Sequence, residues 1–140
     1  MMIAPERDAK RIMHMMRFRN GRVLVCEDNP LIAEGWSAML RAAGYDVAVP
    51  VATAEKALQE AQRRLPDLAL VDIVLHGGVD GISLATELAP LGVTIIFVTA
   101  DYQRAADQRD YAADILIKPV RYSVLVEAVR AALEQRFALR

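Results

Sequence analysis

The chain has 140 residues, of which 54% are hydrophobic, and this is enough for one domain with a substantial core. Its 17 basic and 18 acidic side chains are interspersed and sum to −1, so no global charge attracts nucleic acid or an anionic membrane. No apolar run reaches the roughly 20 residues that span a bilayer, and the lone Cys26 has no disulfide partner. We therefore expect one cytoplasmic domain that binds neither nucleic acid nor membrane directly.

From Arg22 onward, short apolar runs alternate with longer segments of helical period, which is typical of a repeated β/α unit with a parallel sheet. The runs lack polar alternation, as strands buried on both faces do. Strands are predicted over residues 23–26, 45–49, 68–71, 93–98 and 114–117.

Helical segments separate these runs, and they are predicted over residues 30–43, 54–65, 81–89, 101–112 and 122–133. The first begins with an Asn29 cap followed by proline, and the second begins with a Thr53 cap. The fourth contains few large apolar residues, so we expect it to be held loosely. With helices between all the strands, both faces of the sheet should be covered.

Residues 1–21 stand outside this repeat, so we divide the chain into an N-terminal extension, 1–21, and an α/β domain, 22–140. Residues 5–18 have a helical pattern with Ile12, Met13 and Met16 on one side. Two interpretations remain open: an extension frayed in solution, as termini often are, and a packing or dimerising arm. A dimerising arm would make the protein a homodimer.

Charged and hydroxyl side chains follow the ends of four predicted strands. Glu27 and Asp28 follow the first, Asp72 the third, Thr99 the fourth and Lys118 the fifth. Because the carboxyl ends of the strands share one edge of a wound parallel sheet, we expect these side chains to converge on one pocket.

Three carboxylates gathered within roughly 5 Å repel by about 3 kcal/mol per pair at an effective dielectric constant of about 20, so their grouping predicts a bound cation. Mg²⁺ prefers oxygen ligands and keeps several waters. This suits Asp28 and Asp72 as direct ligands and Glu27 as a ligand through water. A backbone carbonyl near Val74 can complete the set.

The other two strand-end residues fit a phosphoryl group beside that metal. The ammonium of Lys118 is expected to pair with Asp72 and then with an added phosphoryl group as a point charge. The Thr99 hydroxyl can donate a hydrogen bond to a phosphoryl oxygen and move toward it. Such a movement would couple the pocket to the rest of the fold.

These residues occur in short motifs that are weak singly and specific together: Glu27-Asp28, Asp72, Asp80-Gly81, Thr99-Ala100 and Lys118-Pro119. In this combination, over about residues 22–136, the chain resembles the receiver domain of bacterial two-component response regulators. The resemblance implies a flavodoxin-like, doubly wound, five-stranded parallel sheet of strand order 2-1-3-4-5 with helices on both faces.

The resemblance also implies a function. Asp72 would be the nucleophile that accepts a phosphoryl group from a histidine kinase or phosphotransfer protein in the presence of Mg²⁺, and Lys118 and Thr99 would read the phosphorylated state. The protein would be no enzyme beyond its own phosphorylation and dephosphorylation. Because Arg140 ends the chain at the fifth helix, we expect a stand-alone receiver that signals through a downstream protein target.

The sequence departs from the family pattern at two places. The loop over residues 75–81 replaces the usual Met-Pro-x-x-Asp-Gly and is one residue longer, and Ile115 stands where a switching Tyr or Phe is usual. These departures keep open a second hypothesis, a receiver-like interaction module that works without phosphorylation. A nucleotide- or flavin-binding enzyme is disfavoured, since the chain contains neither G-x-G-x-x-G nor a P-loop.

Overall fold

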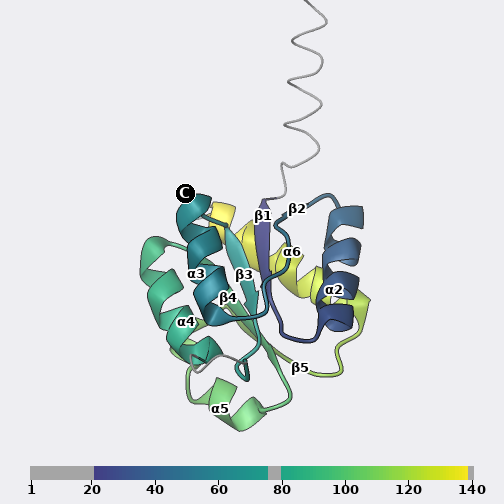
Figure 1. Cartoon of the computed structure of the whole chain (residues 1–140). Helices are drawn as coiled ribbons and strands as arrows, with labels where there is room; N and C mark the ends of the chain where they lie inside the picture. Colours follow the sequence, from purple (N-terminus) through teal and green to yellow (C-terminus); the bar gives the residue numbers. More distant parts are fainter. Residues whose placement is uncertain (1–20, 76–79, 139–140) are drawn as a thin grey trace, which may run out of the picture.

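The computed structural model of the chain describes residues 21–75 and 80–138 and contains one five-stranded parallel sheet (Figure 1). The strands lie in the order β2-β1-β3-β4-β5, which confirms the predicted flavodoxin-like topology. Register is set by pairs such as Val23 with Leu68 and Leu68 with Thr94. The strands are β1 (Arg22–Cys26), β2 (Asp46–Val47), β3 (Leu68–Val71), β4 (Thr94–Thr99) and β5 (Asp114–Ile117).

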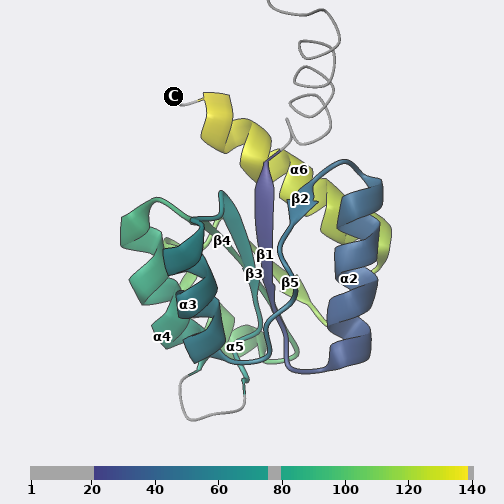
Figure 2. The same cartoon turned by 45° about the horizontal axis from the view of Figure 1, so that its top comes forward.

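Helices cover both faces of the sheet, with α3 and α4 on one side and α2 and α6 on the other (Figures 1 and 2). Two short 3₁₀ turns, η1 (Ala89–Leu91) and η2 (Arg109–Tyr111), complete the described elements. The α-helices are α2 (Pro30–Ala42), α3 (Ala54–Arg63), α4 (Gly81–Leu88), α5 (Tyr102–Ala106) and α6 (Tyr122–Ala138).

The core is divided by the sheet into two buried clusters, because successive strand residues face opposite sides. In β1, Val23 and Val25 pack with α2 and α6, whereas Leu24 and Cys26 pack with α3 and α4. All four side chains are fully buried. The absence of polar alternation in the central strands is therefore explained by burial on both faces.

The predicted helix starts at Asn29 and Thr53 are confirmed. The Asn29 side chain accepts hydrogen bonds from the backbone N–H groups of Leu31 and Ile32, and Thr53 accepts one from Lys56. These caps satisfy N–H groups that lack partners within the helix. The first cap starts α2 at Pro30, directly after the segment at the end of β1 that contains Glu27 and Asp28.

Two predicted elements are corrected by the structure. The strand predicted over 45–49 is limited to Asp46–Val47, because Pro50 has no N–H to continue the ladder and pairing resumes only at an isolated bridge of Val51 with Cys26. The fourth helix, predicted over 101–112, is broken into α5 and η2. Within α5 only Ala105 is buried, so little apolar surface holds a longer helix in place.

At the amino end of β1, a buried arginine links three elements. Arg22 is 8% exposed and pairs with Asp46 of β2 at 3.3 Å and with Glu60 of α3 at 3.0 Å. Its backbone N–H donates to Asp67. This network lies at the edge of the sheet opposite the predicted pocket, so its role is in stability.

The predicted extension, 1–21, lies outside the described residues apart from Gly21, and so does the part of the predicted long loop that contains His76. Among residues 21–75 and 80–138, no helix is both long and apolar enough to span a membrane.

Candidate functional site

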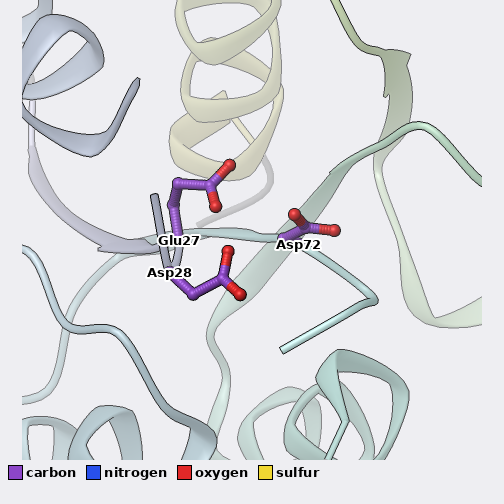
Figure 3. Close-up of side chains that lie close together, drawn as sticks. All are labelled: Glu27, Asp28 and Asp72. Atoms are coloured by element: carbon purple, nitrogen blue, oxygen red, sulfur yellow. The ribbon is translucent and has the colours of Figure 1, made fainter. Parts of the chain in front are cut away.

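Three carboxylates converge at the carboxyl edge of the sheet (Figure 3). Glu27 and Asp28 follow β1 and Asp72 follows β3, and one oxygen from each lies within 4.8 Å of the others. Glu27 is 2% exposed and Asp72 is 4% exposed. Adjacent parallel strands in the middle of the sheet explain the convergence, since β1 and β3 are direct neighbours.

Lys118, directly after β5, brings a positive charge to this cluster. Its Nζ lies 2.5 Å from Asp72 Oδ2 and also pairs with Glu27 Oε1. Burial lowers the pKa of Lys118, but the hydrogen bonds and charges of Asp72 and Glu27 outweigh burial and hold that pKa above its usual value. The ammonium is therefore charged at neutral pH and offsets part of the carboxylate repulsion.

Both side-chain oxygens of Glu27 have partners. Oε1 pairs with Lys118, and Oε2 accepts a hydrogen bond from the Asn29 N–H at 3.0 Å. Burial raises the pKa of Glu27, and the hydrogen bond from Lys118 opposes that rise without cancelling it. The sequence predicted that Glu27 lies in the pocket but gave no signal that it pairs with Lys118, which follows the last strand.

Asp72 is held by its own loop as well as by Lys118. Its Oδ1 accepts a hydrogen bond from the Val74 N–H at 3.0 Å, and its backbone N–H donates to the Cys26 carbonyl at 3.1 Å. The Val74 side chain is exposed. Val74 thus contacts the site through its backbone N–H. The role of its carbonyl as a metal ligand stays a prediction.

Thr99 is the last residue of β4 and is fully buried. Its Oγ1 accepts a hydrogen bond from the Asp101 N–H at 3.1 Å, and its carbonyl accepts one from the Lys118 N–H at 3.0 Å. Thr99 is thereby connected through its hydroxyl to the loop that starts α5, and through its carbonyl to the backbone of the lysine that contacts Asp72.

The Asp80-Gly81 motif has a steric basis. A Cβ atom on Gly81 would lie 2.0 Å from the carbonyl oxygen of Asp72 and 2.8 Å from Val71 Cγ1. Asp80 accepts a hydrogen bond from the Ser83 N–H and so caps α4. The glycine lets the start of α4 pack directly on the backbone of Asp72.

Ile115, one of the two departures from the family pattern, lies on β5, and Tyr102 lies at the start of α5. Ile115 is partly buried against the α3 and α4 face of the core, and Tyr102 is 50% exposed at the start of α5. Asp101 caps α5 by accepting from the Arg104 N–H at 3.2 Å. Its side chain therefore has a structural role close to Thr99.

One residue near the site was missed by the sequence analysis. Trp36 of α2 is 3% exposed, and the Lys118 Nζ lies 5.7 Å from the centroid of its ring. A lone tryptophan on a helix gives no sequence signal for this contact. Both residues border a cavity of about 510 Å³, lined by Ile32, Trp36, Ala100, Lys118, Pro119, Val120 and Tyr122.

A parallel sheet of order 2-1-3-4-5, with three acids, a threonine and a lysine at its carboxyl edge, defines a CheY-like receiver domain. The family model of the response regulator receiver domain matches residues 23–130, and the chain belongs to this family.

Known proteins similar to the chain include response regulators of mycobacteria. The chain is 35% identical over 118 residues to the DNA-binding response regulator MtrA of Mycolicibacterium smegmatis, covering 81% of this chain and 51% of that protein. It is 32% identical over 118 residues to the transcriptional regulatory protein PdtaR of Mycobacterium tuberculosis, covering 81% and 57%. The chain thus spans about half the length of these relatives.

Solved receiver structures share the fold. The signal receiver domain of a modulated diguanylate cyclase from Desulfovibrio desulfuricans G20 aligns with a TM-score of 0.76 at 32% identity, covering 86% of this chain and 98% of that chain. A CheY-like receiver domain protein from Methanospirillum hungatei JF-1 aligns with a TM-score of 0.78 at 27% identity, covering 85% and 98%.

Proposed function

We propose that the chain is a phosphorylation switch. Asp72 accepts a phosphoryl group from a histidine kinase or phosphotransfer protein in a Mg²⁺-dependent reaction, and the change is passed to a downstream protein partner. The observation that carries this proposal is the convergence of Glu27, Asp28 and Asp72 within 4.8 Å, with the Lys118 ammonium 2.5 Å from Asp72.

Asp72 is suited to be the nucleophile because its carboxylate is fixed by two donors. The Val74 N–H holds Oδ1 and Lys118 holds Oδ2, and each oxygen keeps a further lone pair. An Asp72 oxygen forms a bond to phosphorus while the bond from phosphorus to the donor breaks, and the electron pair leaves with the donor. An ionised carboxylate needs no general base for this step.

The residues of the pocket fit a magnesium ion. Three carboxylates supply hard oxygen donors, and such a group in a partly buried site calls for a compensating cation. Asp28 and Asp72 would hold the ion directly, with the Val74 carbonyl, and Glu27 would act through water because both its oxygens are engaged by Lys118 and Asn29. Bound Mg²⁺ supplies neutralisation of negative charge on the phosphoryl oxygens.

Lys118 and Thr99 are the residues that read the new group in this proposal. Phosphorylation adds negative charge beside Lys118, which draws the ammonium toward the phosphoryl oxygens. The Thr99 hydroxyl keeps its hydrogen for donation to the same oxygens, and its movement pulls on the Asp101 N–H and so on α5. With Ile115 in the usual aromatic position, this path through α5 carries the signal without a swinging ring.

We further propose that the chain catalyses only its own phosphorylation and dephosphorylation and that it acts in the cytoplasm. The buried free thiol of Cys26 is consistent with a reducing compartment. MtrA is a DNA-binding response regulator, but we propose no nucleic-acid binding for this chain.

The test is the intact mass of the protein after incubation with acetyl phosphate, with and without Mg²⁺. We expect the wild type to gain one phosphoryl group only with Mg²⁺, Asp72→Asn to gain none, and the exposed control Asp110→Asn to behave as the wild type. Equal phosphoryl gain by Asp72→Asn and the wild type would refute the proposal. A folded wild type that gains no phosphoryl group would favour the phosphorylation-independent module.

A further inference from the structure

The Lys118 ammonium has a third neighbour besides its two carboxylates. Its Nζ lies 5.7 Å from the centroid of the Trp36 ring, within the roughly 6 Å over which a cation is attracted to the face of an indole. The ring belongs to the single tryptophan of the chain and is 3% exposed. The ammonium is therefore within interaction distance of two carboxylates and an aromatic ring.

Trp36 is more rigid than the lysine beside it. The indole is held in the buried cluster that contains Leu40 of α2 and Leu125 of α6, whereas the lysine side chain is a flexible four-carbon stem. Trp36 and Lys118 border the same cavity of about 510 Å³, whose other walls are mostly apolar. On the cavity side, the indole gives the ammonium an attractive surface that aliphatic neighbours such as Ile32 and Val120 lack.

We propose that Trp36 is a positioning residue for phosphoryl transfer: its ring holds the Lys118 ammonium against Asp72, where the incoming phosphoryl oxygens arrive. The proposal rests on the proposed function of Asp72 and adds to it a residue on α2 that touches neither phosphorus nor metal. Without the ring, the ammonium samples more of the cavity, and phosphoryl uptake becomes slower.

Trp36 also contributes to packing, so the test has to separate the charge distribution of the ring from its volume. Because the chain has one tryptophan, growth on fluorinated tryptophan labels position 36 alone. Successive fluorine atoms withdraw electron density from the ring face and change its shape little. The rate of phosphoryl uptake from acetyl phosphate with Mg²⁺ is measured by intact mass for the mono-, di- and trifluorinated full-length protein.

We expect the uptake rate to fall with each fluorine, by about 3- to 30-fold over the series, which is the range of a partly desolvated cation–π contact. The urea midpoint of unfolding should change little. In the same samples, the Lys118 Hε protons should show an upfield ring-current shift by NMR that is lost in Trp36→Leu.

Substitutions provide the matched comparison. Trp36→Phe keeps an aromatic face and should retain most of the rate of phosphoryl uptake. Trp36→Leu has no aromatic face and should take up phosphoryl about 3- to 30-fold more slowly than the wild type. Leu125→Ala removes volume from the same buried cluster at a residue that does not line the cavity. This variant should unfold at lower urea concentration yet take up phosphoryl at nearly the wild-type rate.

A rate that is flat across the fluorinated series, or an equal slowing in Leu125→Ala and Trp36→Leu, overturns the positioning role and leaves the proposed function standing. If the unlabelled wild type takes up no phosphoryl group, the proposed function fails and the positioning role fails with it. The two failures are therefore distinguishable in one set of samples.

Discussion

Replacing Gly81 by alanine should damage both stability and the phosphoacceptor site. The added Cβ would lie 2.0 Å from the carbonyl oxygen of Asp72, more than 1 Å inside the roughly 3.3 Å of a close carbon–oxygen contact. The obstructing atom belongs to the backbone, so no side-chain rotation relieves the clash. Either α4 or the segment that carries Asp72 has to move.

The magnitude follows from overpacking, which costs about 1–3 kcal/mol and here falls at the upper end because the obstruction is backbone. A gain of about 0.5–1 kcal/mol from replacing glycine in the first turn of a helix offsets part of this. We expect a net loss of about 2 kcal/mol in the free energy of unfolding, or roughly 8 °C in the melting temperature. Displacement of Asp72 should also slow phosphoryl uptake by at least tenfold, since about 1 Å of misplacement is costly for group transfer.

Gly92→Ala is the matched control. Gly92 has φ of +89°, but a Cβ there would meet nothing within 4 Å, so its alanine variant carries backbone strain without a clash. We expect a loss of about 1 kcal/mol in the free energy of unfolding. The rate of phosphoryl uptake should stay at the wild-type value, because η1 is remote from the acidic cluster. Urea unfolding and intact-mass kinetics measure both variants. If Gly81→Ala were no less stable than Gly92→Ala and took up phosphoryl normally, the steric reasoning would be wrong.

Three further predictions use other parts of the structure. Asp28→Ala should abolish Mg²⁺-dependent phosphorylation and Mg²⁺ binding by calorimetry, and a retained binding isotherm would count against it as a ligand. Burial raises the pKa of the Cys26 thiol to about 12, so the thiolate forms only at high pH and thiol reagents at pH 8 should label unfolded protein alone; rapid native labelling would contradict this burial. Arg22→Met should lower the free energy of unfolding by about 2 kcal/mol, because Asp46 and Glu60 lose a buried partner; an unchanged urea midpoint would show that the network adds no stability.

Much of the fold could be predicted from the sequence because its signals are local. Central strands buried on both faces have continuous apolar runs, and helix starts have capping residues such as Asn29. The strand-end positions of Asp28, Asp72 and Lys118 then place these residues on one edge, since parallel strands end together. Local pattern and topology were thus enough to assemble the acidic pocket.

Other features were predicted only in part, and one depends on a tertiary contact that leaves no local signal. Pro50 interrupts the pairing of β2 after two residues although the run 45–49 is apolar enough for a longer strand. The segment that follows Thr99 contains helix formers, yet it is broken because only Ala105 is buried in α5. The contact of Trp36 with Lys118 joins α2 to the end of β5, and neither residue type predicts such a contact.

The central claim is that Asp72 itself carries the phosphoryl group, and reductive trapping tests it most directly. Borohydride converts an aspartyl phosphate to homoserine, so the protein is incubated with acetyl phosphate and Mg²⁺, reduced, digested and sequenced by mass spectrometry. We expect homoserine at position 72 alone, and none when acetyl phosphate is left out. Homoserine at position 28 instead, or at no position in a sample whose intact mass includes a phosphoryl group, would contradict the assignment.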